Sequence, residues 1–92
     1  MKLTIGFYCG LARRICQETE IVVQVPVGAT LRDVSAALAA RYPGLVGPLI
    51  ASSTFDLVPP HFLNINGQRA SSMDDRPRDG DRILLMAVTA GG

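Results

Sequence analysis

One segment of this chain carries a strong helix pattern, and it constrains the fold more than any other feature. Thr30 is a favourable N-cap residue, and Asp33 stands where its carboxylate can bond back to the helix start. Apolar residues then recur at helical spacing along one face, at Leu31, Val34 and Leu38. Pro43 ends the pattern, because a residue before proline avoids the α region. This amphipathic helix needs a flat apolar surface to lie against.

Strand patterns lie on both sides of this helix. Residues 2–8 and 20–25 alternate apolar and polar side chains, which predicts an antiparallel pair of strands. Residues 61–67 form a strand that ends in Asn66-Gly67, a strong hairpin signal, and residues 68–75 include a short edge strand. Residues 82–88 are apolar on both sides, so we expect the first and last strands to be central neighbours. Residues 9–14 form a turn or one short helical turn, and residues 44–60 form a loop with at most one helical turn.

The predicted fold class is therefore α+β, a mixed four- to five-stranded sheet with one long helix packed across one face. The 92 residues make a single domain, 1–92, in which residues 89–92 form a flexible C-terminal tail. Nine Lys and Arg against eight Asp and Glu leave no electrostatic footprint for nucleic acid or for a membrane surface. No apolar run reaches the roughly 20 residues that span a bilayer. We expect a soluble cytoplasmic protein.

Few side chains offer catalytic chemistry. Cys9 and Cys16 lack the spacing of a zinc site, and His61 is the only histidine that could join them. Sequence spacing alone permits a disulfide between the two cysteines, but a reducing compartment disfavours it. The simplest interpretation is two buried or half-buried thiols, the alternatives being redox activity or a metal contact between chains. We therefore predict no catalytic constellation and no metal site within the domain.

The carboxyl end carries the most informative motif. The chain ends in Gly91-Gly92, two small residues after an apolar strand. Many termini are simply frayed, so the motif has a structural as well as a functional interpretation. A tail without side chains is slim enough to enter a narrow channel in another protein, where a nucleotide can approach the terminal carboxylate.

The whole order of elements resembles the sulfur-carrier proteins of the β-grasp, ubiquitin-like class. That class includes the small subunit of molybdopterin synthase and the thiamine-thiazole sulfur carrier. The resemblance rests on the Asp79-Gly80-Asp81 turn, the apolar last strand and the closing Ala90-Gly91-Gly92. It implies a β-grasp fold and a chain that is a carrier subunit rather than an enzyme.

The resemblance also implies roles for the tail. The Gly92 carboxylate would be adenylated by an E1-like enzyme that uses ATP, and then converted to a thiocarboxylate, while Thr89, Ala90 and Gly91 thread the partner's active site. The chain itself would bind no cofactor tightly. Further implied partners are a sulfur donor of the cysteine desulfurase or rhodanese type and an acceptor enzyme such as the molybdopterin synthase large subunit. The sulfur could instead serve thiamine, cysteine or tRNA thiolation.

A partner-binding patch follows from the strand alternation. Lys2, Thr4 and Gly6 mark the solvent face of the first strand. Ile83, Leu85 and Ala87 then point to the helix, and Leu84, Met86 and Val88 form an outward apolar patch suited to binding. Alternatively, a loop within residues 47–60 covers this patch, or the chain dimerises there. Two other functions share the diglycine end: a ubiquitin-like modifier that is joined to lysines, and a non-covalent interaction module whose tail is incidental.

Overall fold

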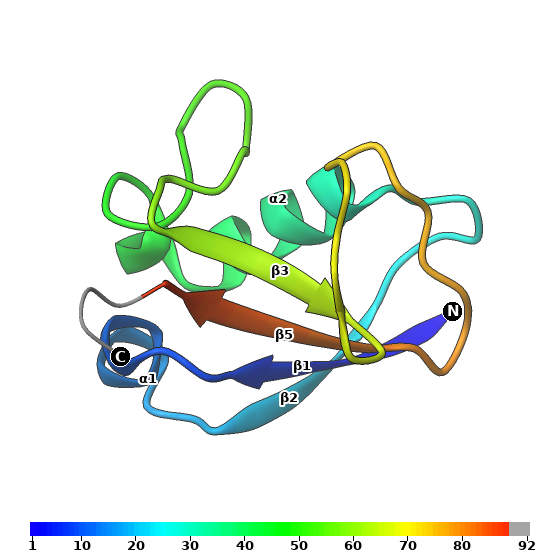
Figure 1. Ribbon diagram of the computed structural model, residues 1–92, viewed down its shortest axis with the longest axis horizontal. Helices are drawn as coiled ribbons and strands as arrows, with labels where there is room; N and C mark the ends of the chain where they lie inside the picture. The colour runs from blue at the N-terminus through cyan, green and yellow to red at the C-terminus, as the bar shows by residue number, and fades with distance from the viewer. Residues whose placement is uncertain (89–92) are drawn as a thin grey trace.

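A computed structural model describes residues 1–88 and shows a five-stranded sheet with two α-helices (Figure 1). The predicted tail, residues 89–92, lies outside the described residues. Within residues 1–88, no helix is both long and apolar enough to cross a membrane. The elements, in chain order, are β1 (Lys2–Phe7), α1 (Gly10–Cys16), β2 (Glu20–Gln24), α2 (Leu31–Arg41), the 3-10 turn η1 (Pro43–Leu45), β3 (His61–Ile65), β4 (Gln68–Arg69) and β5 (Arg82–Ala87).

The sheet order is β2-β1-β5-β3-β4, so the first and last strands are central neighbours as predicted. β1 runs antiparallel to β2 and parallel to β5, and β3 runs antiparallel to both β5 and β4. Phe7 pairs with Leu85, and Leu85 pairs in turn with Leu63 on β3. Because β1 and β5 are parallel, the two chain segments that follow them leave the sheet at the same edge.

The helix α2 starts with the predicted capping box. The Thr30 hydroxyl accepts from the Asp33 amide at 3.3 Å, and the Asp33 carboxylate accepts from the Thr30 amide at 2.9 Å. The crossing segment that leads to β5 supplies further acceptors, because Leu31 N–H donates to the Asp75 carbonyl and Arg32 N–H to the Met73 carbonyl, both at 2.9 Å. These bonds satisfy amides that a helix start leaves open, and they fix α2 against the sheet.

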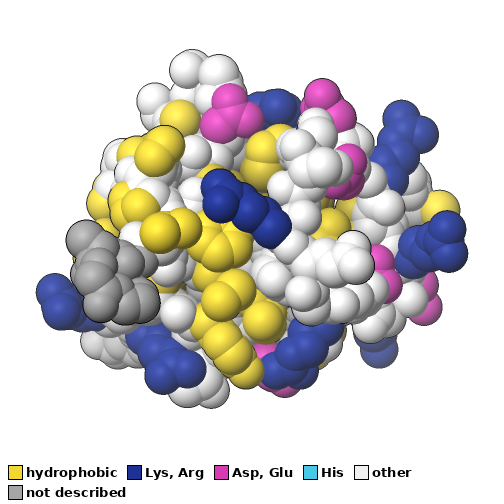
Figure 2. Space-filling view, in the orientation of Figure 1, with side chains coloured by type: hydrophobic (Ala, Val, Ile, Leu, Met, Phe, Trp, Pro, Cys, Tyr) yellow, Lys and Arg dark blue, Asp and Glu magenta, His cyan; other side chains and the backbone are white. Residues whose placement is uncertain are grey.

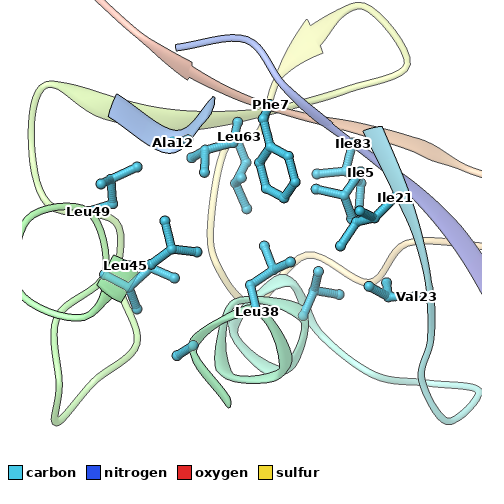
Figure 3. Close-up of a cluster of buried hydrophobic side chains, with 14 of the residues drawn as sticks. Ile5, Phe7, Ala12, Ile21, Val23, Leu38, Leu45, Leu49, Leu63 and Ile83 are labelled. Carbon is cyan, nitrogen blue, oxygen red and sulfur yellow. The ribbon is translucent and has the colours of Figure 1, made fainter. Parts of the chain in front are cut away.

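The core fills the space between α2 and one face of the sheet (Figure 3). Inward residues of the central strands meet the apolar stripe of α2, and a T-shaped contact of 5.9 Å between the Phe7 and Tyr42 rings closes one end. Five strands with α2 across one face give the α+β sheet predicted from the pattern and the β-grasp arrangement that the resemblance implied. The fully buried core side chains include Leu3, Ile5, Phe7, Leu31, Val34, Leu38, Ile83 and Leu85.

The segment after β1 differs from the prediction. In place of a turn or one short helical turn within residues 9–14, α1 runs on to Cys16. Ala12 and Cys16 stand one turn apart and are both buried, so tertiary packing stabilises a helix whose sequence is weak. It opens with Gly10 and has no side-chain cap, which hid it from the sequence pattern.

Residues 46–60 form the predicted loop, preceded by the single turn η1. Leu49 and Ile50 are nevertheless fully buried in the core. The guanidinium of Arg32 on α2 holds this loop, through the Asp56 carboxylate at 2.6 Å and the Thr54 carbonyl at 2.7 Å. The loop is therefore tied to the helix layer.

Candidate functional site

Opposite α2, the sheet presents a face that is partly apolar, here called the outer face (Figure 2). The central feature is a row of three side chains across neighbouring strands. Phe62 on β3 pairs with Met86 on β5. On the other side of β5, Phe7 pairs with Leu85, so the next residue, Tyr8, lies beside Met86. With their apolar neighbours these side chains form a surface that we call the outer-face patch. It consists of Tyr8, Phe62, Leu84, Met86 and Val88.

The three residues predicted to point outward are placed on this face. Leu84 and Met86 are half-buried by their neighbours, and Val88 is 55% exposed. The loop of residues 46–60 is tied to α2 by Arg32 and leaves Val88 uncovered, which does not support the alternative that this loop closes over the patch.

Sequence reasoning missed the two aromatic members of the patch. Tyr8, which is 49% exposed, continues the outward alternation of β1 one residue beyond the strand. Phe62 precedes the core residue Leu63, so the same alternation rule places it outward. Applying the period of two to residues 8 and 62 would have found both.

Gly6 corrects one detail of the prediction, because it is buried rather than solvent-facing. A Cβ at this position would lie 2.8 Å from Cδ2 of Leu84 and 3.0 Å from Cε1 of Tyr8. The two side chains therefore close over the glycine from both sides. The missing side chain lets the patch lie flat on the sheet.

Cationic side chains lie along the patch, as Figure 2 shows. The guanidinium of Arg69 stands 4.4 Å from the centre of the Phe62 ring, and that of Arg13 stands 5.7 Å from the centre of the Tyr8 ring. Arg82 forms an ion pair with Glu20 at 2.6 Å. The nearby Tyr8 side chain, and then Glu20, raise the pKa of Arg82 above its ordinary value.

The predicted tail residues Thr89, Ala90, Gly91 and Gly92 lie outside the described residues. The chain up to them is well anchored, because the Val88 amide still donates to the Pro60 carbonyl at 3.0 Å. The last described residue therefore remains hydrogen-bonded one residue beyond β5, at the end of the sheet where Tyr8 follows β1.

The two cysteines are buried free thiols at opposite ends of α1. Seven residues of helical rise separate their Cα atoms by about 10 Å, which exceeds the reach of a disulfide. Burial, with a contribution from Cys9, raises the pKa of the Cys16 thiol to about 11. Cys16 is therefore a neutral, unreactive thiol at pH 7. Among residues 1–88, no cluster of His, Cys, Asp and Glu has the geometry of a metal site.

The remaining polar candidates serve the fold. Nδ1 of His61 lies 3.0 Å from the Val58 carbonyl. In the Asp-Gly-Asp turn, the Asp79 carboxylate accepts from the Lys2 amide at 2.6 Å. The Asp81 carboxylate accepts from the Arg78 amide at 2.8 Å and from Nδ2 of Asn66 at 3.0 Å, and these bonds lower the pKa of Asp81. The turn thus joins β1 to β5.

Comparison with known proteins supports the fold. No protein-family model matches the chain, and no curated protein gives a significant match. Similar solved structures include SAMP1 from Haloferax volcanii, at 21% identity and a TM-score of 0.84, with 100% of both chains covered.

Two further structures share the fold. Molybdopterin converting factor subunit 1 from Pyrococcus furiosus is 19% identical, with a TM-score of 0.79 and coverage of 97% of this chain and 99% of that one. A chain of the BexX/CysO complex from Amycolatopsis orientalis is 19% identical, with a TM-score of 0.73 and coverage of 98% and 99%. The β-grasp, ubiquitin-like fold is thereby confirmed.

Proposed function

We propose that this chain is a sulfur-carrier protein whose Gly92 carboxylate is adenylated by an E1-like enzyme and converted to a thiocarboxylate. The thiocarboxylate then donates sulfur in cofactor or metabolite biosynthesis, in the manner of the molybdopterin synthase small subunit. The observation that carries the proposal is the Gly-Gly end that follows Val88 after two intervening residues, where a strand bonded on both sides anchors the chain. The fold shared with SAMP1 and molybdopterin converting factor subunit 1 supports it.

The chemistry requires activation, because a free carboxylate is a poor acyl donor. A Gly92 carboxylate oxygen attacks the α-phosphate of ATP, and pyrophosphate leaves. A persulfide sulfur on the donor then attacks the acyl-adenylate carbonyl and expels AMP. A second thiol attacks the resulting acyl persulfide, forms a disulfide with the donor sulfur and releases the thiocarboxylate. In this scheme the partner uses the ATP, and the carrier is its substrate.

Each part of the site then has a role. Thr89, Ala90 and Gly91 thread the partner's active site, because none of them has a large side chain. The outer-face patch docks on the partner and holds the tail in register. A half-exposed apolar patch beside the tail exit suits a protein surface. The similar chain from the BexX/CysO complex supports a protein partner in general.

The implied partners are an E1-like enzyme, a cysteine desulfurase or rhodanese-like sulfur donor, and an acceptor such as a molybdopterin synthase large subunit. The likeness to molybdopterin converting factor subunit 1 favours a pterin acceptor. Thiamine, cysteine and tRNA thiolation use the same activated carrier and remain alternative acceptors.

Intact-mass spectrometry tests the proposal. We expect the chain, incubated with its E1-like enzyme, ATP and a sulfur donor, to gain the mass difference between sulfur and oxygen at Gly92. A chain lacking Gly92 and a chain extended by one alanine are the matched controls, and neither should be charged. A wild-type chain that stays uncharged, in a mixture that charges a known carrier, would contradict the proposal.

A second candidate is a ubiquitin-like modifier that forms isopeptide bonds with lysines. It is favoured by the likeness to a structure named small archaeal modifier protein 1. Both candidates share adenylation and differ only in the nucleophile, which is an amine instead of a sulfur atom. Proteins that carry a Gly-Gly remnant on lysine, found only in cells that contain Gly92, would identify the modifier. Unchanged function without Gly92 would instead indicate a non-covalent module.

A further inference from the structure

Two arginines border the outer-face patch on opposite sides. Arg13 comes from α1 and lies over Tyr8, whereas Arg69 comes from β4 and lies over Phe62. Met86 stands between the two rings, on the strand between β1 and β3. Strand spacing places the two aromatic residues roughly 10 Å apart, so one apolar side chain of a partner fits between the arginines.

Neither arginine is neutralised within the described chain. Arg32 and Arg82 form ion pairs with carboxylates, but Arg13 and Arg69 have no such partner among residues 1–88. Both are exposed at the rim of the patch. Two cations therefore border an apolar surface on which no carboxylate of residues 1–88 pairs with them.

The geometry of Arg13 prepares it to bind an acid. Its Nε donates to the Phe7 carbonyl at 2.7 Å, and its two terminal amino groups make no hydrogen bond to residues 1–88. Stacking on Tyr8 restricts the side chain further, so little conformational entropy is lost when a ligand binds. A planar guanidinium held in this way matches a carboxylate, which it can bind through two hydrogen bonds.

We infer that Arg13 and Arg69 recognise two acidic side chains of the partner, which flank an apolar residue inserted over Met86. The inference rests on the proposed function, because the partner is the E1-like enzyme that docks on the outer face. Complementary charge of this kind steers association and fixes the register of the docked surfaces. The inference therefore predicts that the docking surface of the E1-like enzyme carries one apolar residue between two carboxylates.

Charge reversal tests the inference through the kinetics of charging. We expect Arg13→Glu and Arg69→Glu each to raise the KM for the carrier about tenfold, with kcat unchanged, because docking is weakened and the chemistry is not. Rising NaCl concentration should raise the wild-type KM and affect the double variant little.

Arg41→Glu is the matched control. Arg41 also stacks on an aromatic ring, 5.4 Å from the centre of Tyr42, but it ends α2 on the other layer of the molecule. The same change of charge there should leave the KM within about twofold of wild type. Arg69→Glu breaks no backbone bond, so it tests the inference even if loss of the Phe7 contact unfolds Arg13→Glu.

The outcomes separate the two claims. A wild-type chain that is charged, with a double variant whose KM equals that of Arg41→Glu, overturns this inference and leaves the proposed function standing. A wild-type KM that does not change with NaCl concentration also overturns this inference and leaves the proposed function standing. A wild-type chain that is never charged overturns both.

Discussion

Gly6 determines how closely Leu84 and Tyr8 approach each other across the sheet. Its φ lies outside the region that favours glycine, so the requirement at this position is space and not backbone freedom. A methyl group would meet flexible side-chain ends at 2.8 and 3.0 Å, and those ends would have to shift. The smallest residue in the sheet thus shapes the surface proposed to meet the partner.

Gly6→Ala is therefore expected to keep the fold and disturb the outer-face patch. Overpacking should lower the free energy of unfolding by about 1 kcal/mol, and the displaced Leu84 and Tyr8 should raise the KM of charging. Gly10→Ala is the control, since a Cβ there meets nothing within 4 Å. Urea denaturation and charging kinetics measure the two effects. A Gly6→Ala variant with wild-type KM would show that the partner does not contact these side chains.

Single residues also show where sequence reasoning succeeds. Thr30 and Asp33 identified a helix start because capping chemistry is local. Asn66-Gly67 identified a hairpin for the same reason, and both residues adopt positive φ. Arg13 and Arg69 are also near their rings in sequence, since Arg13 lies over Tyr8 and Arg69 reaches Phe62 across the β3–β4 hairpin. That the two pairs lie on one face of the sheet depends on the sheet order, which no local pattern predicts.

Among the elements, the turn between residues 78 and 81 links the two central strands. Besides the carboxylate bonds of Asp79 and Asp81, Gly80 N–H donates to the Lys2 carbonyl at 2.8 Å, and Thr4 N–H donates to the Asp81 carbonyl at 3.1 Å. The motif that supported the family resemblance therefore has a structural explanation. The hydrogen bonds of this turn align the first residues of β1 with the first residues of β5.

Asp81 should make part of the stability depend on pH. Bonds from the Arg78 amide and Asn66 lower its pKa in the folded protein. The stabilisation is therefore present above the ordinary value of 3.8 and is lost as pH falls through the lower folded value. We expect Asp81→Asn to cost about 1 kcal/mol at pH 7 and progressively less in acid.

Chemical denaturation of wild type and variant between pH 7 and pH 2 measures this difference. Glu18→Gln is the control, because the Glu18 carboxylate makes no hydrogen bond or ion pair within residues 1–88. A stability difference for Asp81→Asn that stays constant with pH would show that the carboxylate charge is unimportant.

The elements differ in how far their sequence defines them. α2 has a cap, an apolar stripe and a terminating proline, and its bounds were predicted closely. α1 has seven residues, no side-chain cap and a glycine at its start, so packing against β1 and η1 decides its length. The burial of Leu49 and Ile50 in a proline-rich loop likewise comes from contacts that only the folded chain brings together, such as the bridge between Ile50 and Leu57.

At the scale of the whole molecule, the outer face has one region suited to docking. The core is enclosed between α2 and the inner face, whereas Met86 and its neighbours lie at the centre of the opposite face. The alternation of side chains along β5 was enough to predict the part of the patch that β5 contributes. Its full outline required the sheet order, because Tyr8 and Phe62 come from strands on either side of β5.

Met86→Asp tests the docking role of the whole face. We expect a folded protein of reduced stability whose KM for charging rises about tenfold, as for removal of a central interface residue. Val22→Asp is the matched control, because Val22 also lies on the outer face, is 56% exposed and belongs to β2, outside the patch. Thermal unfolding confirms the fold of both variants. A folded Met86→Asp protein that is charged normally would rule out this docking surface.

β5 has a hydrogen-bonded neighbour along each of its edges, β1 on one and β3 on the other. A pull applied at Val88 acts along the axis of this strand. Such a load is shared by two ladders in shear, so their bonds must yield together rather than opening one at a time. Tension at the carboxyl end is therefore resisted by both ladders of β5.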